Sequence, residues 1–282
     1  MIKWAFNFRA WQPSKSEWML CGQCIQSEEK DRIQRFVFKK DAKAAMAGRL
    51  LIRKAITECL NLPYKEIKLG RTEKGKPFLV NLVQESFRFN VSHNGEFAVL
   101  AASRNGNIGI DVMKYEVRSS VPNFFHTMRR QFTESEWTQI RKPTQECEQL
   151  KIFYRLWCLK ESYVKALGVG IGFEVSRLDF TFNTEYLQEN VVTTDTYLKV
   201  DGVHLPEWTF EEHSINNHCI VVARSPKDTP DCVEEDNPCS FEVLELNDLL
   251  RNAKPSYEPD EGFWGNFEPK EEAPQIGREI RS

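Results

Sequence analysis

Hydrophobic positions along the first 225 residues follow two periods, one typical of strands and one typical of helices. Trp4, Phe6 and Phe8 alternate with smaller or polar side chains, which indicates a strand. Similar short apolar or β-branched runs predict further strands at 67–70, 87–91, 97–102, 108–112, 178–182, 197–200, 208–211 and 219–223. Helical spacing predicts helices that begin at Ser27, Asp41, Thr133 and Glu148. Two successive parts of this stretch share one rhythm, a helix followed by antiparallel strands, which favours an α+β fold.

The predicted helix ends depend on capping residues. Ser27 and Asp41 are candidate N-caps, and residues 133–136 form a capping box. The glycine-rich run 168–172 follows the helix predicted at 148–167 and precedes a strand. A dinucleotide-binding loop needs the opposite order, so this run predicts a helix C-cap and a turn.

The helix at 148–167 combines an apolar face with a carboxylate. Glu161 lies between Trp157 and Val164 at helical spacing, and Lys165 follows one turn later. A carboxylate in an apolar stripe is costly unless a cation or several donors satisfy it. The helix alone leaves two interpretations open, a structural Glu–Lys pair or two residues that share an anionic ligand.

A second carboxylate stands in the middle of the β-branched strand at 108–112. Asp111 follows the apolar strand 97–102 across the segment 104–107, which has the composition of a hairpin turn. Asp111 and Glu161, both in apolar surroundings, are suited to share one hard cation. Mg²⁺ is commonly held by one or two carboxylates, with water and substrate phosphates completing the octahedron.

These two segments together carry a family resemblance. Gly109-Ile110-Asp111, followed about fifty residues later by Trp157-Cys-Leu-Lys-Glu-Ser-Tyr-Val-Lys165, resembles the paired motif of 4′-phosphopantetheinyl transferases, over roughly residues 25–224. The resemblance implies transfer of 4′-phosphopantetheine from coenzyme A to a serine of an apo carrier protein, with release of 3′,5′-ADP. It also implies a pseudo-dimer of two similar α+β halves, each with antiparallel strands packed on a long helix and with the active site in the cleft between them.

The resemblance assigns roles to individual residues. Asp111 and Glu161 are the expected Mg²⁺ ligands, and together with Lys165 they are the expected catalytic residues, the proton acceptor being Glu161 or a metal-held water. Residues matching the coenzyme A site are Arg32, Arg71, Thr72, Glu73, Lys74, Gly75, Lys76, Asn90, Val91, Ser92, His93, Asp111, Glu161 and Lys165. Many relatives carry a second acidic residue two positions after the aspartate, where this chain has Met113. Water is expected to replace that ligand, positioned by a side chain such as Asn94.

Without the resemblance, two of these segments have ordinary explanations. The loop 71–76 places three cations around Gly75, which suits a phosphate site but also an exposed hairpin tip. His93 follows a predicted strand, in a predicted turn at 92–95, and histidines there are more often structural than ligand-binding. Lys160 could also stabilise phosphate charge, but it lies on a different side of its helix from Lys165, which is therefore the first candidate.

Composition and charge indicate the kinds of partner and the cellular compartment of the protein. Residues 226–282 hold 15 Asp/Glu against 6 Lys/Arg, a balance of −9, which leaves +6 for the rest of a chain whose net charge is −3. A basic body suits phosphates and acidic protein partners. The sequence shows no secretory signal, membrane span or nucleic-acid platform, so we expect a cytosolic protein with its eight cysteines reduced.

We expect three regions: 1–112 with the coenzyme A loop and Asp111, 113–225 with the Glu161 helix, and an acidic, proline-rich extension at 226–282. Within the extension, 241–250 and 263–267 predict short elements docked on the body. The resemblance further implies a monomer. It also implies, as partners, the acyl carrier protein domain of fatty acid synthase and the carrier domains of aminoadipate-semialdehyde dehydrogenase and formyltetrahydrofolate dehydrogenase type enzymes.

Two other classes of function compete with the transferase. A Mg²⁺-dependent phosphate-ester hydrolase would use the same carboxylates and basic loops, and would release phosphate from a nucleotide without a carrier protein. A non-catalytic binding module would most naturally have lost some metal or phosphate residues. Because Asp111, Glu161, Lys165, His93 and Lys76 are all present, the binding module ranks last.

Overall fold

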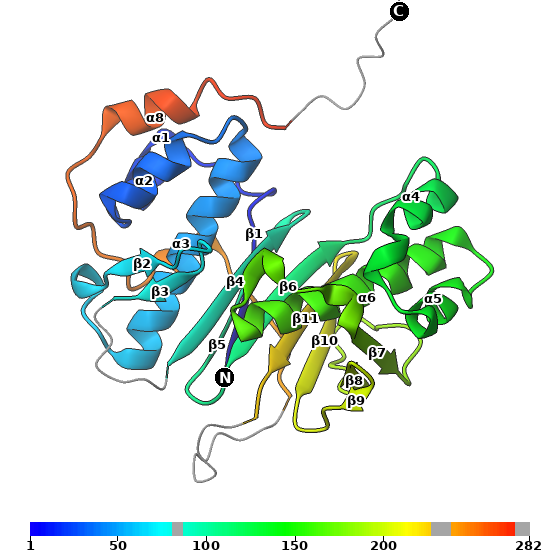
Figure 1. Ribbon diagram of the computed structural model, residues 1–282. Helices are drawn as coiled ribbons and strands as arrows, with labels where there is room; N and C mark the ends of the chain where they lie inside the picture. Colours follow the sequence, from blue (N-terminus) through cyan, green and yellow to red (C-terminus); the bar gives the residue numbers. More distant parts are fainter. Residues whose placement is uncertain (81–86, 227–237, 274–282) are drawn as a thin grey trace, which may run out of the picture.

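Two 22-residue helices, each lying across one face of a mainly antiparallel sheet, organise the molecule (Figure 1). The computed structural model describes residues 1–80, 87–226 and 238–273. Helix α3 (Lys39–Leu60) packs on the first sheet and helix α6 (Glu146–Leu167) on the second. The mixture of helices and antiparallel strands confirms the predicted α+β class.

The first sheet has the strand order β12-β1-β5-β4. Its strands are β12 (Glu242–Val243), β1 (Ile2–Asn7), β5 (Phe97–Ser103) and β4 (Arg88–Asn94). Strand β5 is buried along its whole length because α3 covers one face and a second apolar cluster covers the other. Around this sheet lie α1 (Lys15–Gln23), α2 (Ser27–Gln34), a 3₁₀ turn (Tyr64–Glu66) and the small hairpin of β2 (Leu69–Arg71) and β3 (Pro77–Leu79).

The second sheet has the order β10-β11-β6, and α6 packs on its β6 and β11. Its strands are β10 (Thr209–Ile215), β11 (His218–Arg224) and β6 (Ile108–Lys114). A smaller sheet of β7 (Leu178–Phe182), β8 (Thr196–Val200) and β9 (Val203–His204) lies beyond it. The outer helices are α4 (Val121–Met128) and α5 (Glu134–Arg141), with 3₁₀ turns at Arg129–Gln131, Gly170–Gly172 and Val175–Arg177. The predicted capping box is present, since the side chains of Thr133 and Glu136 bond each other's backbone N–H.

The predicted hairpin of strands 97–102 and 108–112 is wrong. Strand β5 pairs with β1 and β4, whereas β6 pairs along its whole length with β11, more than a hundred residues away in sequence. Gly106 does adopt a left-handed conformation, with φ of 72°. The connecting segment, however, bonds to the end of β11, because Ser225 N donates to the carbonyl of Asn107. The turn therefore carries the chain from one sheet into the other.

Strands β4 and β6 meet at the centre of the molecule, where one sheet ends and the other begins (Figure 1). In place of a backbone ladder, side chains of β4 bind the backbone of β6. Asn90 Oδ1 accepts a hydrogen bond of 3.0 Å from Ile110 N, and Asn94 Oδ1 accepts one of 2.9 Å from Lys114 N. Strand β4 thus continues to Asn94, so the turn predicted at 92–95 is shorter and later than expected.

Two predicted N-caps are also wrong. The caps are Gln26 and Phe38, and neither side chain makes a capping hydrogen bond. At the start of α3, the N–H groups of Lys39 and Lys40 donate instead to the carbonyls of Glu271 and Glu272, at 2.8 and 3.0 Å. The C-terminal segment supplies the acceptors that a capping side chain would otherwise provide.

The C-terminal segment packs on the first half, and both short elements predicted in it are present. Strand β12 runs parallel to β1, and α7 (Leu246–Leu250) contacts α3. Helix α8 (Glu261–Phe267) stacks Phe263 and Phe267 on the fully buried Trp18 of α1. The cysteines of the described residues are free thiols. No helix in the described ranges has the length and apolar character needed to cross a membrane.

Candidate active site

Asp111 is buried on β6 and is only partly satisfied. Its Oδ1 accepts a hydrogen bond of 2.8 Å from Ser92 Oγ and one of 2.6 Å from Lys165 Nζ. Its Oδ2 is buried and has no hydrogen-bond partner. Buried polar atoms are nearly always paired, so this carboxylate oxygen is a candidate ligand for a cation.

Gly109, two residues earlier, allows α6 to come close to Asp111. A Cβ at this position would lie 2.0 Å from the Ser162 carbonyl oxygen and 2.3 Å from Ala166 N. No side chain fits between these backbones, so glycine permits direct contact between β6 and α6. This close approach brings Glu161 and Lys165 of α6 next to Asp111 of β6.

Glu161 is half-buried, and within the described residues it makes no hydrogen bond or ion pair. Burial raises its pKa, the negative charge of Asp111 raises it further, and Lys165 lowers it. Lys165 does not bind Glu161 directly. It donates to Asp111 and, at 2.9 Å, to Ser92 Oγ. Two carboxylates and one lysine from two elements therefore converge on one point.

Next to this point lies a cleft of about 530 Å³. Its walls come from the β2–β3 loop, β4, α6 and the segments at 131 and 168–175. The lining residues are Lys74, Gly75, Lys76, Pro77, Asn90, Val91, Gln131, Trp157, Glu161, Val164, Lys165, Gly168, Gly170, Phe173 and Val175. The cleft is therefore cationic at one wall and apolar at another.

The loop lysines reach across this cleft to the C-terminal end of α6. Lys76 Nζ donates to the Lys165 carbonyl at 3.1 Å, and Lys74 Nζ donates to the Val169 carbonyl. Partial burial and the charge of Arg88 lower the pKa of Lys76. Thr72 Oγ1 closes the loop by accepting a hydrogen bond of 3.1 Å from Lys76 N, while Glu73 is exposed.

A second hollow of about 540 Å³ is lined by Arg32 and Arg71 beside the buried Glu29. Arg71 donates to both carboxylate oxygens of Glu29, at 3.2 and 2.9 Å, and to the Gly75 carbonyl at 2.9 Å. His93 keeps a large accessible surface. The surrounding protein nevertheless lowers its pKa, and Lys165 and Arg49 lower it further. The histidine is therefore neutral at pH 7 and keeps one N–H donor.

Residues 9–105 match the family described as 4′-phosphopantetheinyl transferase, N-terminal, and residues 107–223 match the 4′-phosphopantetheinyl transferase superfamily. The chain is 45% identical over 287 residues to the L-aminoadipate-semialdehyde dehydrogenase-phosphopantetheinyl transferase of Homo sapiens, covering 97% of this chain and 93% of the relative. The protein of that name from Mus musculus is 44% identical, with 94% and 90% covered. A 4′-phosphopantetheinyl transferase of Bacillus subtilis is 31% identical over 147 residues, covering 52% of this chain and 62% of the relative. The chain belongs to the 4′-phosphopantetheinyl transferase superfamily.

The two carboxylates beside Lys165 are of the kind that Mg²⁺ binds. The ion prefers carboxylate oxygens, and Asp111 Oδ2 and the Glu161 carboxylate are both unpaired and adjacent. Within the described ranges, no group of three or more His, Cys, Asp or Glu side chains could hold a metal. Met113 is instead packed against the apolar core of the second half, and the Asn94 amide oxygen is already bonded to β6. The two carboxylates fit the ion, with further ligands left to water and substrate.

The structure places most of the predicted coenzyme A residues in the cleft or in the adjoining hollow. Those lining the cleft are Lys74, Gly75, Lys76, Asn90, Val91, Glu161 and Lys165. Those at the adjoining arginine hollow are Arg32 and Arg71. Ser92 binds Asp111, and Asn90 uses its amide oxygen to hold β6 as well as lining the cleft. Their contacts with a ligand stay predictions.

Several residues near the site had no strong sequence signal. Glu29 and Arg49 are helix residues that look solvated in the sequence, yet both are buried beside Arg71. Gln131 and Phe173 line the cleft from segments outside the two motifs. A helical-wheel analysis of α3 could have indicated Arg49, because it falls between the buried residues Ala42, Met46 and Ile52.

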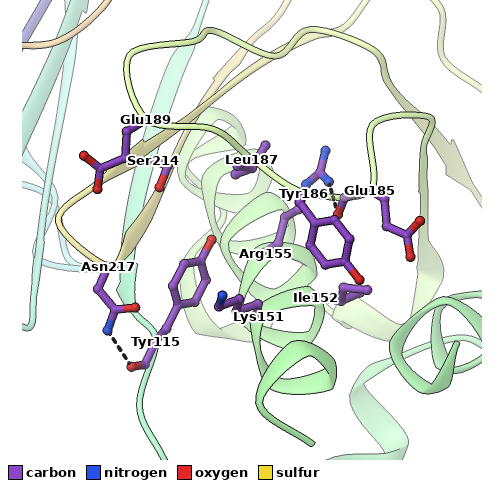
Figure 2. Close-up of a pocket in the computed structure, with 10 residues that line it drawn as sticks. All are labelled: Tyr115, Lys151, Ile152, Arg155, Glu185, Tyr186, Leu187, Glu189, Ser214 and Asn217. Atoms are coloured by element: carbon purple, nitrogen blue, oxygen red, sulfur yellow. Dashed lines mark hydrogen bonds between the residues drawn. The ribbon is translucent and has the colours of Figure 1, made fainter. Parts of the chain in front are cut away.

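A further hollow, of about 340 Å³, lies at the other end of α6 (Figure 2). Lys151 of α6 points toward Tyr115 there, whereas Arg155 points toward Glu185, beside Tyr186. Arg155 is fully used, since it binds Glu212 with two hydrogen bonds of 2.6 and 2.8 Å and also the Thr184 carbonyl. This hollow therefore has a satisfied guanidinium, whereas the Glu161 side chain that lines the cleft beside Asp111 has no partner among the described residues.

Proposed function

We propose that this chain transfers the 4′-phosphopantetheine group of coenzyme A to a serine of apo carrier proteins, with Mg²⁺, and releases 3′,5′-ADP. The observation that carries the proposal is the unpaired Asp111 Oδ2 beside Glu161 and Lys165, at the edge of a cleft lined by the loop lysines. This arrangement combines two carboxylates suited to a metal ion with cations suited to phosphate.

Coenzyme A would lie in the cleft between the two halves. Trp157, Val164 and Phe173 offer apolar surface for the pantetheine arm. Lys74 and Lys76 would exchange their carbonyl partners for phosphate oxygens, which make stronger, charge-assisted hydrogen bonds. Neutral His93 would donate its single N–H to a phosphate oxygen. The nucleotide end would extend toward Arg32 and Arg71.

The chemistry is an in-line displacement at the phosphorus that carries the pantetheine arm. The serine oxygen forms a bond to phosphorus, and the bond from phosphorus to the oxygen of 3′,5′-ADP breaks. Glu161, or a water held by the metal, would accept the serine proton. Lys165 would offset the negative charge that develops on the phosphate oxygens. Bound Mg²⁺, held by Asp111 and Glu161, would polarise the phosphoryl group.

Carrier proteins would approach a body with an excess of positive charge. Residues 1–225 carry +6, which favours encounter with acidic carrier domains. The partners that we propose are the carrier domains of fatty acid synthase and of aminoadipate-semialdehyde dehydrogenase and formyltetrahydrofolate dehydrogenase type enzymes. We also propose that the transferase works as a monomer in the cytosol.

The test is the intact mass of an apo acyl carrier protein after incubation with this chain, coenzyme A and Mg²⁺. We expect a gain of about 340 Da, the mass of one phosphopantetheine group, with one 3′,5′-ADP released per carrier. EDTA should prevent both changes. Phosphate release without any carrier protein would indicate the hydrolase instead. No mass gain with several folded carriers would contradict the proposal.

A further inference from the structure

Arg49 of α3 is a buried arginine whose hydrogen-bonding capacity is unused. Only 7% of the residue is exposed, and its Nη1 is buried with no hydrogen-bond partner. Its one ion pair joins Nε to Glu29 Oε2 at 3.5 Å, without a hydrogen bond. A guanidinium carries five N–H donors, and buried donors are nearly always paired. An acceptor is therefore missing from this position.

The charges around Arg49 do not balance. Glu29 is the carboxylate that faces Arg49, and it is already bound through both oxygens by Arg71. Burial lowers the pKa of Arg49 to about 10; Glu29 opposes this shift, and the positive charges of Arg71 and Arg32 add to it. Arg71 and Arg49 thus share one carboxylate, and Arg32 adds a third positive charge nearby. A dianion placed among them would offset the surplus positive charge and supply acceptors.

Charges of both this arginine group and the proposed reaction centre act on His93. Lys165 and Arg49 both lower the pKa of His93, while Asp41 and Asp111 both raise it. Geometry links the two places as well, because Arg71 lines the arginine hollow and donates at 2.9 Å to the carbonyl of Gly75, which lines the cleft. If the diphosphate of coenzyme A occupies the Asp111–Lys165 side, where the bond breaks, the arginine side receives the other phosphate of the molecule. That group is the 3′-phosphate of the ribose.

We propose that Arg49 is a specificity-determining residue for the 3′-phosphate of coenzyme A, acting with Arg32 and Arg71. Arg49 lies outside the paired motif at 109–111 and 157–165, on α3, and its ion pair with Glu29 places it next to the arginine hollow. Glu29 holds Arg71 beside Arg49 before the ligand arrives. The inference rests on the proposed function, because it takes coenzyme A as the ligand of the cleft.

The test compares coenzyme A with 3′-dephospho-coenzyme A as donor substrates. In Arg49→Met, kcat/KM for coenzyme A should fall by about 10- to 100-fold, the cost of losing a charge-assisted contact. For the dephospho compound, kcat/KM should change by less than about threefold, so the preference for coenzyme A collapses. The kcat at saturating coenzyme A should stay close to wild type, and Arg49→Lys should restore part of the preference.

Arg53 provides a matched control on the same helix. It is also buried, and although its Nε has no partner, its two terminal nitrogens donate to the carbonyls of Tyr64 and Ile67, at 2.6 and 3.2 Å. Arg53→Met should lower the melting temperature while keeping the wild-type ratio of kcat/KM for the two donors. An equal fall for both donors in Arg49→Met would show a merely structural role and overturn the inference.

A binding measurement separates this inference from the proposed function. By calorimetry, Arg49→Met should weaken binding of 3′,5′-ADP while leaving binding of 5′-AMP unchanged. Wild-type transfer with an unchanged nucleotide preference in Arg49→Met would refute the role of Arg49 alone. Failure of the wild type to transfer from coenzyme A would refute the proposed function. If Arg49→Met does not fold, the same ratios are measured with Arg49→Lys, which should lie between the wild-type preference and none; a wild-type ratio would overturn the inference.

Discussion

Helix α6 carries two lysines five residues apart, and each binds a buried carboxylate in a different way. Lys160 pairs with Glu136 at 2.8 Å, and both side chains are fully buried. Lys165 pairs with Asp111 at 2.6 Å, where 29% of the lysine side chain and 7% of the aspartate side chain are exposed. Similar pairs on one helix thus have different surroundings.

The two pairs differ in how many of their polar atoms have a hydrogen-bond partner. Lys160 also donates to the Val175 and Leu178 carbonyls, at 2.9 and 2.6 Å. Glu136 accepts from the backbone N–H groups of Thr133 and Phe180 in addition. At the other pair, Asp111 Oδ2 has no partner, and an unpaired Glu161 lies beside it. The complete network is expected to serve stability, and the incomplete one is expected to serve a ligand.

The largest effect should come from Asp111→Asn, which removes the charge at the incomplete pair. Transfer should fall on the order of 10³-fold, because the proposed metal ligand and the partner of Lys165 are both lost. The melting temperature should change little, since asparagine keeps the shape and can still accept from Ser92. Turnover and thermal unfolding are measured on the same preparation. Wild-type turnover would contradict a role for Asp111 in the reaction.

Lys160→Met should mainly lower the stability of the protein, whereas Lys165→Met should mainly lower its transfer rate. Lys160→Met leaves Glu136 buried without its cation, which should cost about 3–5 kcal/mol of stability. Lys165→Met should cost under about 2 kcal/mol because the site is partly open to water. Its transfer rate should nevertheless fall on the order of 100-fold. Urea unfolding and transfer assays measure the two effects, and equal loss of stability in both variants would remove the distinction.

Lys76→Ala should affect binding more than chemistry. The KM for coenzyme A should rise about tenfold, since one charge-assisted contact is lost, while kcat changes little. Lys151→Ala is the control, because it removes an exposed lysine of α6 that lines the separate hollow in Figure 2. An unchanged KM in Lys76→Ala would count against the assignment of the loop to phosphate binding.

The smallest effect should be a pH dependence of stability in the absence of metal. Burial and Asp111 raise the pKa of Glu161 above its ordinary value of 4.5. The folded protein therefore binds this proton more tightly than the unfolded chain does. The stabilisation is complete below the ordinary pKa and is lost as the pH rises through the raised one. Glu161→Gln should match the wild type in acid and exceed it at neutral pH, by melting temperature.

Adding Mg²⁺ should reverse the order of stability of the two proteins at neutral pH, which serves as a control. The ion should bind ionised Glu161 and stabilise the wild type at neutral pH, but stabilise Glu161→Gln less. If the two proteins have parallel stability curves at every pH, Glu161 is not the titrating group.

Motifs in the sequence predicted Asp111 and Glu161 as neighbours, because a Gly-Ile-Asp strand and a Lys-Glu helix form one family pattern. The structure adds the physical reason, which is that Gly109 lets the backbones of β6 and α6 touch. Helical periodicity also predicted α6, and the four-residue motif at 133–136 predicted the capping box of α5. Local patterns succeed where local spacing decides the structure.

Other predictions failed where distant segments decide the structure. The segment at 104–107 resembles a hairpin turn, but β6 finds a longer partner in β11. Asp41 resembles an N-cap, but carbonyls of Glu271 and Glu272 satisfy the start of α3. The pairing of Lys165 with Asp111 depends equally on the meeting of two elements. Such contacts require the tertiary fold and leave no periodic signal in the sequence.

The most direct test of the incomplete pair is Mn²⁺ binding, followed by electron paramagnetic resonance with coenzyme A present. The wild type and the α6 control Lys151→Met should each bind Mn²⁺ at one site. Asp111→Asn should lose that site, and Glu161→Gln should bind the ion more weakly. If Asp111→Asn binds Mn²⁺ as tightly as the wild type, the unpaired oxygen of Asp111 is not a metal ligand and the account of this site is wrong.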